Sequence, residues 1–216
     1  MAGIDFFDVD HTITRHSSGA RFVSLAARRG IVPWHLLFVM PWYSFAYRLG
    51  VFRPEDFKAG FPYLRGVQRS TLERIAKESF ETQLRADIYK DAIALIQDKR
   101  RKGRVVTLAT SSLDFIVRPL ASFLEIETVI ATRLEFDGEV CTGRIAGRPL
   151  FRKEKKRRVL DYISTQREDP RNCSFYSDSI FDAPLLNAIG QPVAVNPDFR
   201  LRRMAREKGW PVLTLS

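Results

Sequence analysis

Two aspartates one residue apart, in Asp8-Val9-Asp10, follow the mostly apolar run at residues 4–7. An apolar run is typical of a buried strand in a parallel sheet, and ligands bind beyond the carboxyl ends of such strands. Neighbouring carboxylates repel each other, so the pair contributes nothing to stability by itself. The arrangement becomes favourable where a divalent cation lies between the carboxylates, or where one is a nucleophile and the other an acid or base. The pair therefore predicts chemistry at this strand end.

Further polar groups occupy similar places along the chain. Thr110-Ser111-Ser112 follows an apolar run, a lysine opens a helical pattern in the basic run 152–158, and Asp178 and Asp182 follow the apolar run 173–177. In a parallel sheet with right-handed crossovers these strand ends meet at one edge. Alone, each group has a plain structural explanation, such as a surface turn or a helix cap. Their joint order along the chain favours a shared site.

The residue types suit phosphoryl transfer, which needs a nucleophile, a proton donor and positive charge around the phosphate oxygens. Asp8 suits the nucleophile, and Asp10 suits the acid that protonates the leaving oxygen and the base that later activates water. Thr110 and nearby backbone N–H groups suit the phosphate oxygens. Asp8 and Asp178 are hard oxygen ligands for Mg²⁺, which takes one or two protein carboxylates and keeps several waters.

Strands that alternate with helical patterns predict an α/β fold, a three-layer, Rossmann-like parallel sheet. We expect its strands at residues 3–8, 104–109, 173–177 and 192–196. An Asp-Gly pair between alternating apolar residues predicts a small β-hairpin within residues 134–141.

About ninety residues separate the first two expected strands, far more than a crossover connection needs. Their pattern is mostly helical, for example at residues 71–80. We interpret residues 15–89 as a helical cap domain, inserted into a catalytic core made of residues 1–14 and 90–216.

The composition limits the class of protein. The chain has 216 residues, of which 45% are hydrophobic and sixteen are phenylalanine, so it builds a real core and is not disordered. Cys141 and Cys173 are too few for a disulfide framework. With the acidic motif standing where a signal peptide would need a basic segment, this favours a cytoplasmic protein. The net charge of +10 suggests anionic partners, although solubility explains it equally well.

These motifs resemble the haloacid dehalogenase superfamily, whose phosphatases carry DxDx[TV], a Ser or Thr, a Lys and an acidic motif in that order. Residues 110–120, 176–179 and 194–198 are similar to the phosphoserine-phosphatase-like subfamily (subfamily IB), which carries a helical cap between the first two motifs. The resemblance implies a Mg²⁺-dependent phosphomonoester hydrolase that works through an aspartyl-phosphate on a small phosphorylated metabolite.

The resemblance also implies the role of each site residue. The set is Asp8 as nucleophile, Asp10 as acid and base, Thr110, Ser111 and Lys155 as phosphate-binding groups, Mg²⁺ on Asp8, Asp178 and the Asp10 carbonyl, and Asp182 in support of the metal.

Which lysine belongs to the third motif depends on the helix face. Lys155 shares a face with Val159, Tyr162 and Ile163, whereas Lys156 aligns with Val159, Leu160 and Ile163. We prefer Lys155 because its separation from the fourth motif is typical of the subfamily. The other charges of the run are expected on a solvated helix face.

Ser17 departs from the subfamily pattern. Phosphoserine phosphatases carry a glutamate at this place, nine residues after the nucleophile, where it reads the substrate's ammonium group. Serine supplies no charge for an amine, so phosphoserine itself is not the expected substrate.

Residues 31–47 form an apolar and aromatic stretch that Pro33 and Pro41 interrupt. Seventeen residues are at the lower limit for a membrane span, and a span would separate Asp8 from the other strand ends, so we reject one. A buried cap helix is favoured over a surface that dips into lipid with Trp34 and Trp42.

Two alternatives to the metabolite phosphatase stay open. A related branch of the superfamily dephosphorylates phosphatidylglycerophosphate, so a lipid-phosphate phosphatase in peripheral contact with an anionic membrane is one. A non-enzymatic polyanion or nucleic-acid binder is the other, but nucleic acid is not expected, because the basic clusters at 99–104 and 152–158 lack interleaved aromatic residues. The sequence leaves the substrate and the oligomeric state open.

Overall fold

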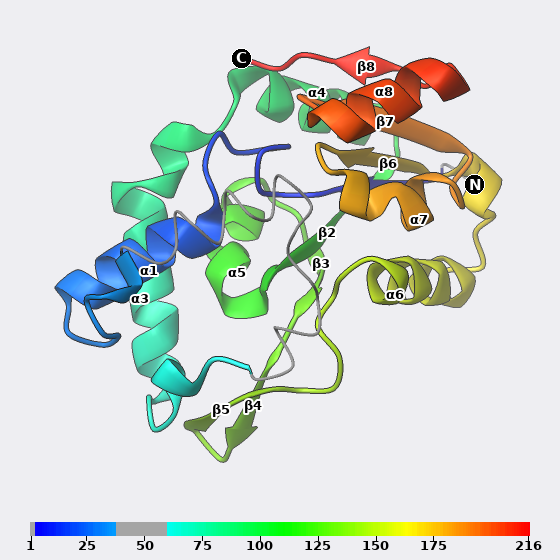
Figure 1. Cartoon of the computed structure of the whole chain (residues 1–216). Coiled ribbons are helices and arrows are strands. Elements are labelled where there is room, and N and C mark those ends of the chain that lie inside the picture. Colours follow the sequence, from blue (N-terminus) through cyan, green and yellow to red (C-terminus); the bar gives the residue numbers. More distant parts are fainter. Residues whose placement is uncertain (1–2, 38–59) are drawn as a thin grey trace.

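The computed structural model describes residues 3–37 and 60–216. These residues form a six-stranded parallel sheet with strand order β3-β2-β1-β6-β7-β8 (Figure 1). The strands are β1 (Ile4–Phe7), β2 (Val105–Leu113), β3 (Thr128–Thr132), β6 (Ser174–Ser177), β7 (Gln191–Val195) and β8 (Val212–Leu213). Every residue of β1 is buried, as expected for a strand covered on both faces.

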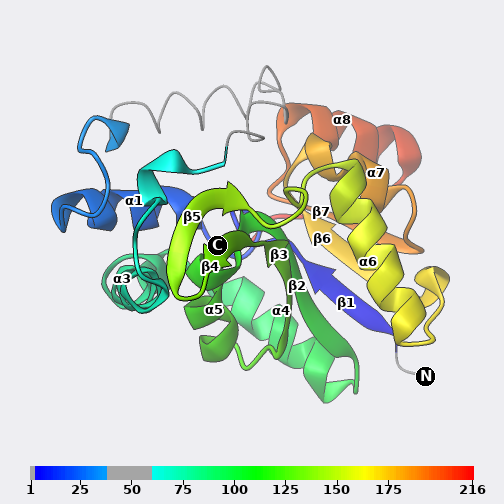
Figure 2. The same ribbon diagram turned by 90° about the horizontal axis from the view of Figure 1, so that it is seen from below.

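Helices cover both faces of the sheet, which gives three layers (Figure 2). The helices of one face are α4 (Lys90–Arg101) and α5 (Asp114–Phe123), and those of the other are α6 (Lys153–Thr165), α7 (Ala183–Leu186) and α8 (Phe199–Lys208). Neighbouring residues of β1 point to opposite faces, so Phe7 packs in the core with α4 and α5, and Phe6 in the core with α6 to α8. The three-layer α/β fold is thus confirmed.

The segment between β1 and β2 builds a third core. Its described elements are α1 (Ser18–Arg28), the 3₁₀ turn η2 (Pro62–Leu64), α3 (Arg69–Thr82) and the 3₁₀ turn η3 (Leu84–Asp87). Phe22 of α1 and Leu72 of α3 pack with Leu113 and Ile116, which belong to β2 and α5. The helices of the insertion therefore rest on the sheet domain through α5. The division into a cap at 15–89 and a core stays a prediction.

The hairpin lies where the Asp-Gly pair predicts it. Strands β4 (Leu134–Asp137) and β5 (Val140–Ile145) pair antiparallel around Gly138 and Glu139. Gly138 has φ +54°, a left-handed conformation that glycine adopts without strain.

The far end of the insertion lies along this hairpin. The amide of Phe61 donates to the Gly143 carbonyl (2.7 Å), and the amide of Gly66 donates to the Cys141 carbonyl (2.8 Å). A Cβ at Gly60 would lie 2.4 Å from the Gly143 oxygen, so this close approach requires glycine. Residues 60–69 and the hairpin thus form one unit.

The structure extends the sequence prediction in two places. Strands β3 and β8, at the two edges of the sheet, were not expected from the sequence. Strand β2 continues to Leu113 instead of ending at 109, and its register with β3 shifts between Ala109 and Leu113. Such an irregularity bends a strand and turns its side chains away from the regular alternation.

The aromatic stretch 31–47 is described only in part, because residues 38–47 lie outside the described residues. Val32 is buried, and Trp34 is 69% exposed. Among the residues that the structure describes, no helix is long and apolar enough to cross a membrane.

Candidate active site

Asp8 begins the loop that follows β1, at the carboxyl edge of the sheet. Its amide donates to the Tyr176 carbonyl (2.9 Å), which continues the pairing of β1 with β6. The next residues turn tightly, since the Val9 carbonyl accepts from the amides of Ile13 (2.8 Å) and Thr14 (3.1 Å). The Asp8 carboxylate accepts from the Val9 amide and is 7% exposed. It is held in a buried position with limited access to solvent.

Lys155 reaches this carboxylate from α6. Lys155, Val159 and Ile163 are the buried residues of α6, at helical spacing on one face, and Lys156 is half-buried. The Lys155 Nζ lies 3.3 Å from Asp8 Oδ2 and 2.7 Å from Asp182 Oδ2. Burial alone would lower the pKa of Lys155, but the two carboxylates outweigh it and raise the pKa. The structure therefore brings the preferred lysine to Asp8, in its charged form.

The loop after β6 carries the second pair of acids. Asp182 Oδ2 accepts from the Ser177 hydroxyl (2.7 Å), and Asp178 Oδ1 accepts from the Thr12 hydroxyl (3.5 Å). Burial raises the pKa of Asp182 to about 6 against the opposing charge of Lys155. Burial also raises the pKa of Asp178 well above its usual range, and the charges of Asp8 and Asp182 raise it further. With Asp8, three buried acids therefore share one lysine, which is an excess of acidic groups over basic ones.

This excess fits a bound cation. Among residues 3–37 and 60–216, no group of three or more His, Cys, Asp or Glu side chains is arranged to hold a metal ion. The predicted Mg²⁺ site needs fewer such side chains, because it uses Asp8, Asp178 and the Asp10 carbonyl, with water in the remaining positions. A divalent cation at Asp178 would relieve the repulsion that raises its pKa. The donor set therefore suits Mg²⁺.

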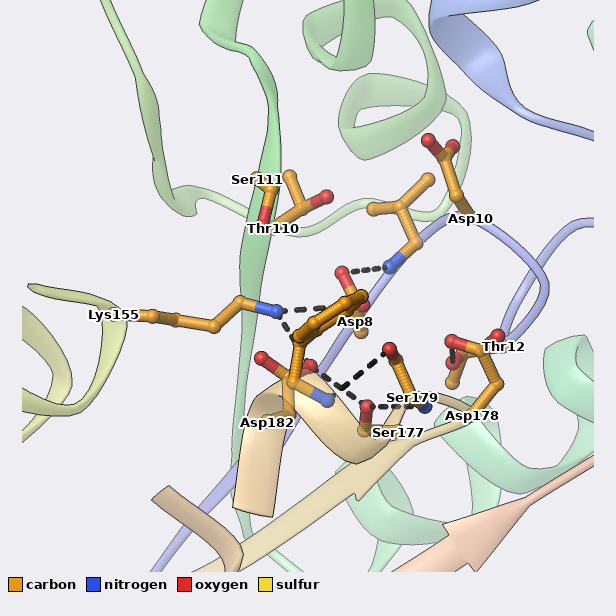
Figure 3. A network of polar contacts seen from close by, with 12 residues as sticks. Asp8, Asp10, Thr12, Thr110, Ser111, Lys155, Ser177, Asp178, Ser179 and Asp182 are labelled. Carbon is orange, nitrogen blue, oxygen red and sulfur yellow. Dashed lines mark hydrogen bonds and ion pairs between the residues drawn. The ribbon is translucent and has the colours of Figure 1, made fainter. Parts of the chain in front are cut away.

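Thr110 and Ser111 lie in the irregular part of β2, across from Asp8 and Lys155 (Figure 3). Thr110 is 1% exposed, and its Oγ1 accepts from the Ser112 amide (3.3 Å). The Ser111 carbonyl accepts from the Thr132 hydroxyl on β3 (2.8 Å). The register shift therefore brings hydroxyl groups to the edge where Asp8 and Lys155 meet.

Asp10 has surroundings that differ from those of Asp8. Figure 3 shows its carboxylate directed away from Asp8. Asp10 Oδ1 accepts from the Ser18 amide (2.8 Å), and Oδ2 accepts from the hydroxyls of Ser112 (3.0 Å) and Ser17 (3.2 Å). The tight turn thus gives the two aspartates separate partners: a lysine for Asp8, and hydroxyl and amide donors for Asp10.

Comparison with known proteins identifies the family. The family model for haloacid dehalogenase-like hydrolases matches residues 6–187, which include the whole site described above. The chain belongs to this family. The membership confirms the resemblance found in the motifs and the α/β fold of haloacid dehalogenase-type hydrolases. Together with relatives that are named as phosphatases, it also confirms the prediction that the chain is a phosphatase of this kind.

Relatives with similar sequences include enzymes named as phosphatases. The chain is 29% identical to a phosphoserine phosphatase of Mycobacterium tuberculosis, over 96% of this chain and 69% of the relative. It is 37% identical to a histidinol-phosphatase of Neisseria meningitidis serogroup C, over 55% of each chain. A third relative, the inhibition of morphological differentiation protein of Streptomyces azureus, is 29% identical over 96% of this chain and 76% of its own length.

Solved structures agree with the fold. A protein of unknown function from Bordetella pertussis Tohama I superposes with a TM-score of 0.85 and 26% identity, covering 99% of this chain and 98% of that one. A substrate-bound phosphoserine phosphatase has a TM-score of 0.75 at 14% identity, over 99% and 93% of the two chains. At 14% identity, this likeness is evidence for the fold and for nothing else.

Sequence reasoning missed several residues that shape the site of this haloacid dehalogenase-type hydrolase. Asp198 caps α8, and its carboxylate also accepts from the Ile180 amide (2.8 Å), so it fixes the loop that carries Asp178. The aspartate of an Asn-Pro-Asp turn before a helix is a recognisable cap signal. Ser17 stood out in the sequence only as the place of the subfamily's glutamate, and Ser18 did not stand out at all. Neither carried a signal toward Asp10, because serine is common at a helix start.

Proposed function

We propose that the protein is a Mg²⁺-dependent phosphomonoester hydrolase that works through an aspartyl-phosphate on a small phosphorylated metabolite. The observation that carries the proposal is the buried contact between Asp8 and Lys155, 3.3 Å apart at the sheet edge beside Thr110. A carboxylate next to a fixed ammonium group suits a phosphate, because the cation neutralises charge on the incoming phosphoryl group.

In the first step, Asp8 Oδ2 or Oδ1 attacks the phosphorus atom in line with the ester oxygen. The phosphorus–oxygen bond of the ester breaks as the bond to Asp8 forms, and the departing alkoxide takes a proton from Asp10. Lys155 and the hydroxyl and amide groups of Thr110 and Ser111 hold the phosphate oxygens.

In the second step, Asp10 takes a proton from a water molecule that attacks the phosphorus of the aspartyl-phosphate. The bond between phosphorus and Asp8 breaks, inorganic phosphate leaves, and Asp10 is protonated for the next cycle. The separate surroundings of Asp8 and Asp10 support this division of roles.

Asp8, Asp178 and the Asp10 carbonyl would hold Mg²⁺, with Asp182 in support. When bound, the cation supplies charge neutralisation between the carboxylates and the phosphate. Residues 15–89 would act as a cap, a role supported by the start of α1 next to Asp10.

The proposed substrate class rests on the relatives. Those named phosphoserine phosphatase and histidinol-phosphatase support a small phosphorylated metabolite, and the comparisons support neither the lipid-phosphate nor the polyanion-binding alternative. The proposal of a cytoplasmic protein is supported by Cys141 and Cys173, which are free and buried thiols.

The test measures phosphate release from 4-nitrophenyl phosphate with Mg²⁺ and with EDTA. We expect turnover with Mg²⁺, loss of turnover with EDTA, and loss of turnover in Asp8→Asn with an unchanged circular dichroism spectrum. The matched control is Asp161→Asn, since Asp161 is an exposed acid of α6 and the change should leave the rate as it is.

A further measurement addresses the covalent step. Rapid acid quenching during turnover of a ³²P-labelled aryl phosphate should trap label on the wild-type chain and none on Asp8→Asn. Full activity of Asp8→Asn, or turnover that EDTA leaves unchanged, would contradict the proposal.

A further inference from the structure

The carboxylate of Asp10 is held by donors from two separate parts of the fold. Ser17 is the N-cap residue of α1 and Ser18 is its first residue, so both belong to the start of the insertion. Ser112 lies in β2, a core strand next to β1. Asp10 therefore sits where the insertion meets the sheet, with contacts to both.

The contacts form a connected set. Ser112 Oγ donates to Asp10 Oδ2 (3.0 Å), and Ser18 Oγ lies 2.9 Å from Ser112 Oγ. A hydroxyl has one proton to donate, so the Ser18 hydroxyl donates to Ser112 when Ser112 donates to Asp10. The Ser18 amide also donates to Asp10 Oδ1 (2.8 Å). Hydrogen bonds to an ionised acceptor are stronger than neutral ones, and the N-terminus of α1 favours a negative charge.

Local structure explains part of this set without Asp10. The Ser17 hydroxyl accepts from the Ala20 amide (3.4 Å), which is an N-cap contact of α1. Ser112 has no comparable duty, since the N-cap residue of α5 is Leu113 and that cap makes no side-chain hydrogen bond. The hydroxyl of Ser112 is therefore the member of the set whose contacts point to Asp10.

We propose that Ser112, with Ser18 behind it, is a positioning residue that sets the Asp10 carboxylate in place for proton transfer to the leaving oxygen. The proposal rests on the proposed role of Asp10 as acid and base. It assigns to Ser112 a part in catalysis although Ser112 itself touches no reacting atom.

Leaving groups of different basicity test the proposal. Phenolate departs poorly unless it is protonated, whereas 4-nitrophenolate departs without help. Both substrates carry the same phosphate group on an aryl oxygen. The ratio kcat/KM covers the steps up to transfer of the phosphoryl group to Asp8, and it excludes the later hydrolysis. A defect in proton donation should therefore lower kcat/KM for phenyl phosphate and spare 4-nitrophenyl phosphate.

We expect Ser112→Ala to lower kcat/KM for phenyl phosphate on the order of tenfold, a part of the 10²–10⁴ that general acid catalysis supplies. The value for 4-nitrophenyl phosphate should change less than about twofold. Ser112→Thr, which keeps a hydroxyl at the same place, should restore most of the loss. The control is Ser122→Ala, an exposed serine of α5, which should change neither value.

A second variant examines the link to the insertion. Ser18→Ala keeps the backbone amide that bonds Asp10 and removes only the hydroxyl behind Ser112. We expect a smaller selective loss for phenyl phosphate, and the effects of Ser18→Ala and Ser112→Ala should not add in the double variant, because the two hydroxyls act as one chain.

Asp10→Asn separates this inference from the proposed function. If Asp10→Asn lowers kcat/KM equally for phenyl phosphate and 4-nitrophenyl phosphate, the proposed role of Asp10 fails. Suppose instead that Asp10→Asn lowers kcat/KM selectively for phenyl phosphate. If a folded Ser112→Ala then lowers kcat/KM equally for both substrates, or for neither, the positioning role of Ser112 is wrong. Should Ser112→Ala not fold, Ser18→Ala and its effect on the same ratio decide the question.

Discussion

Replacing Lys155 by methionine tests the electrostatic account of the site. Methionine fills nearly the same volume with an apolar chain, so packing around Val159 and Ile163 is kept. The change removes the ammonium group that lies 2.7 Å from Asp182 Oδ2 and 3.3 Å from Asp8 Oδ2. The buried acids then lack this counter-charge.

The distances set the size of the effect. With an effective dielectric constant of about 20, the two attractions amount to about 6 and about 5 kcal/mol before the desolvation of the lysine is deducted. Breaking a buried ion pair from one side costs about 3–5 kcal/mol net. We therefore expect Lys155→Met to lower the free energy of unfolding by about 3–5 kcal/mol at pH 7 without Mg²⁺, a large part of the stability of a single domain.

The free energy of unfolding that Lys155→Met loses should depend on pH, with a larger loss at higher pH. The pKa of Asp182 is about 6 in the folded protein and 3.8 ordinarily. Between these two pH values, the folded state therefore binds more protons at this group than the unfolded state does. Stability therefore falls as the pH rises from about 4 to about 6, by about 3 kcal/mol for this group. Lys155 lowers the pKa of Asp178 and Asp182, so its removal extends this window toward neutral pH. The loss should be smaller at pH 5 than at pH 7.

Urea unfolding followed by circular dichroism, in EDTA at pH 5 and pH 7, measures both quantities. The matched control is Lys156→Met, a half-buried neighbour on the same helix, for which we expect less than about 1 kcal/mol at either pH. A loss below about 1 kcal/mol for Lys155→Met at pH 7, or an equal loss at both pH values, refutes the reasoning.

Other predictions concern the metal, an ion pair and the insertion core. Mg²⁺ at a hundredfold excess over its Kd should raise the free energy of unfolding by about 2.7 kcal/mol, and Asp178→Asn should remove this gain in thermal melts; retention of the full gain would place the metal elsewhere. Burial raises the pKa of Asp87, but hydrogen bonds and charge from Arg21 and His16 outweigh it and lower the pKa below 3.8, so the stabilisation is present at neutral pH and disappears as the pH falls below about 4. Asp87→Asn should accordingly lower the urea midpoint at pH 7 and have little effect at pH 3. Phe22 is 1% exposed and packs edge-on against another ring of the same core. Its replacement by alanine should lower the free energy of unfolding, measured in urea, by about 3–5 kcal/mol.

Much of the site was predictable because it depends on strand ends. Each of Asp8, Thr110 and Asp178 follows an apolar run, and parallel topology brings the ends of such runs to one edge. Lys155 was predicted from helical periodicity together with a separation from the fourth motif that is typical of the subfamily. Strand β8 was not expected because two residues, Val212 and Leu213, carry too little pattern to predict a strand.

The surroundings of Asp10 were not predictable in the same way. Ser18 lies eight residues after Asp10, and Ser112 lies 102 residues after it, and serine is common at helix starts and in loops. They meet at the end of β2, in the part of the strand where its register with β3 shifts. Between Ala109 and Leu113 the offset to β3 changes by two residues, which leaves the alternation of the strand in phase and so gives no periodic signal in the sequence.

The pairing of residues 60–69 with the β4–β5 hairpin has a consequence for engineering this enzyme. The two segments interrupt the sheet at separate places in the chain, yet backbone hydrogen bonds join them at several points, including the Arg69 amide to the Glu139 carbonyl (2.8 Å). Because backbone atoms make the joint, side-chain redesign cannot restore it when one partner is absent. A chimera that receives the insertion of a relative should therefore also receive that relative's hairpin, and the two should be exchanged as a single cassette.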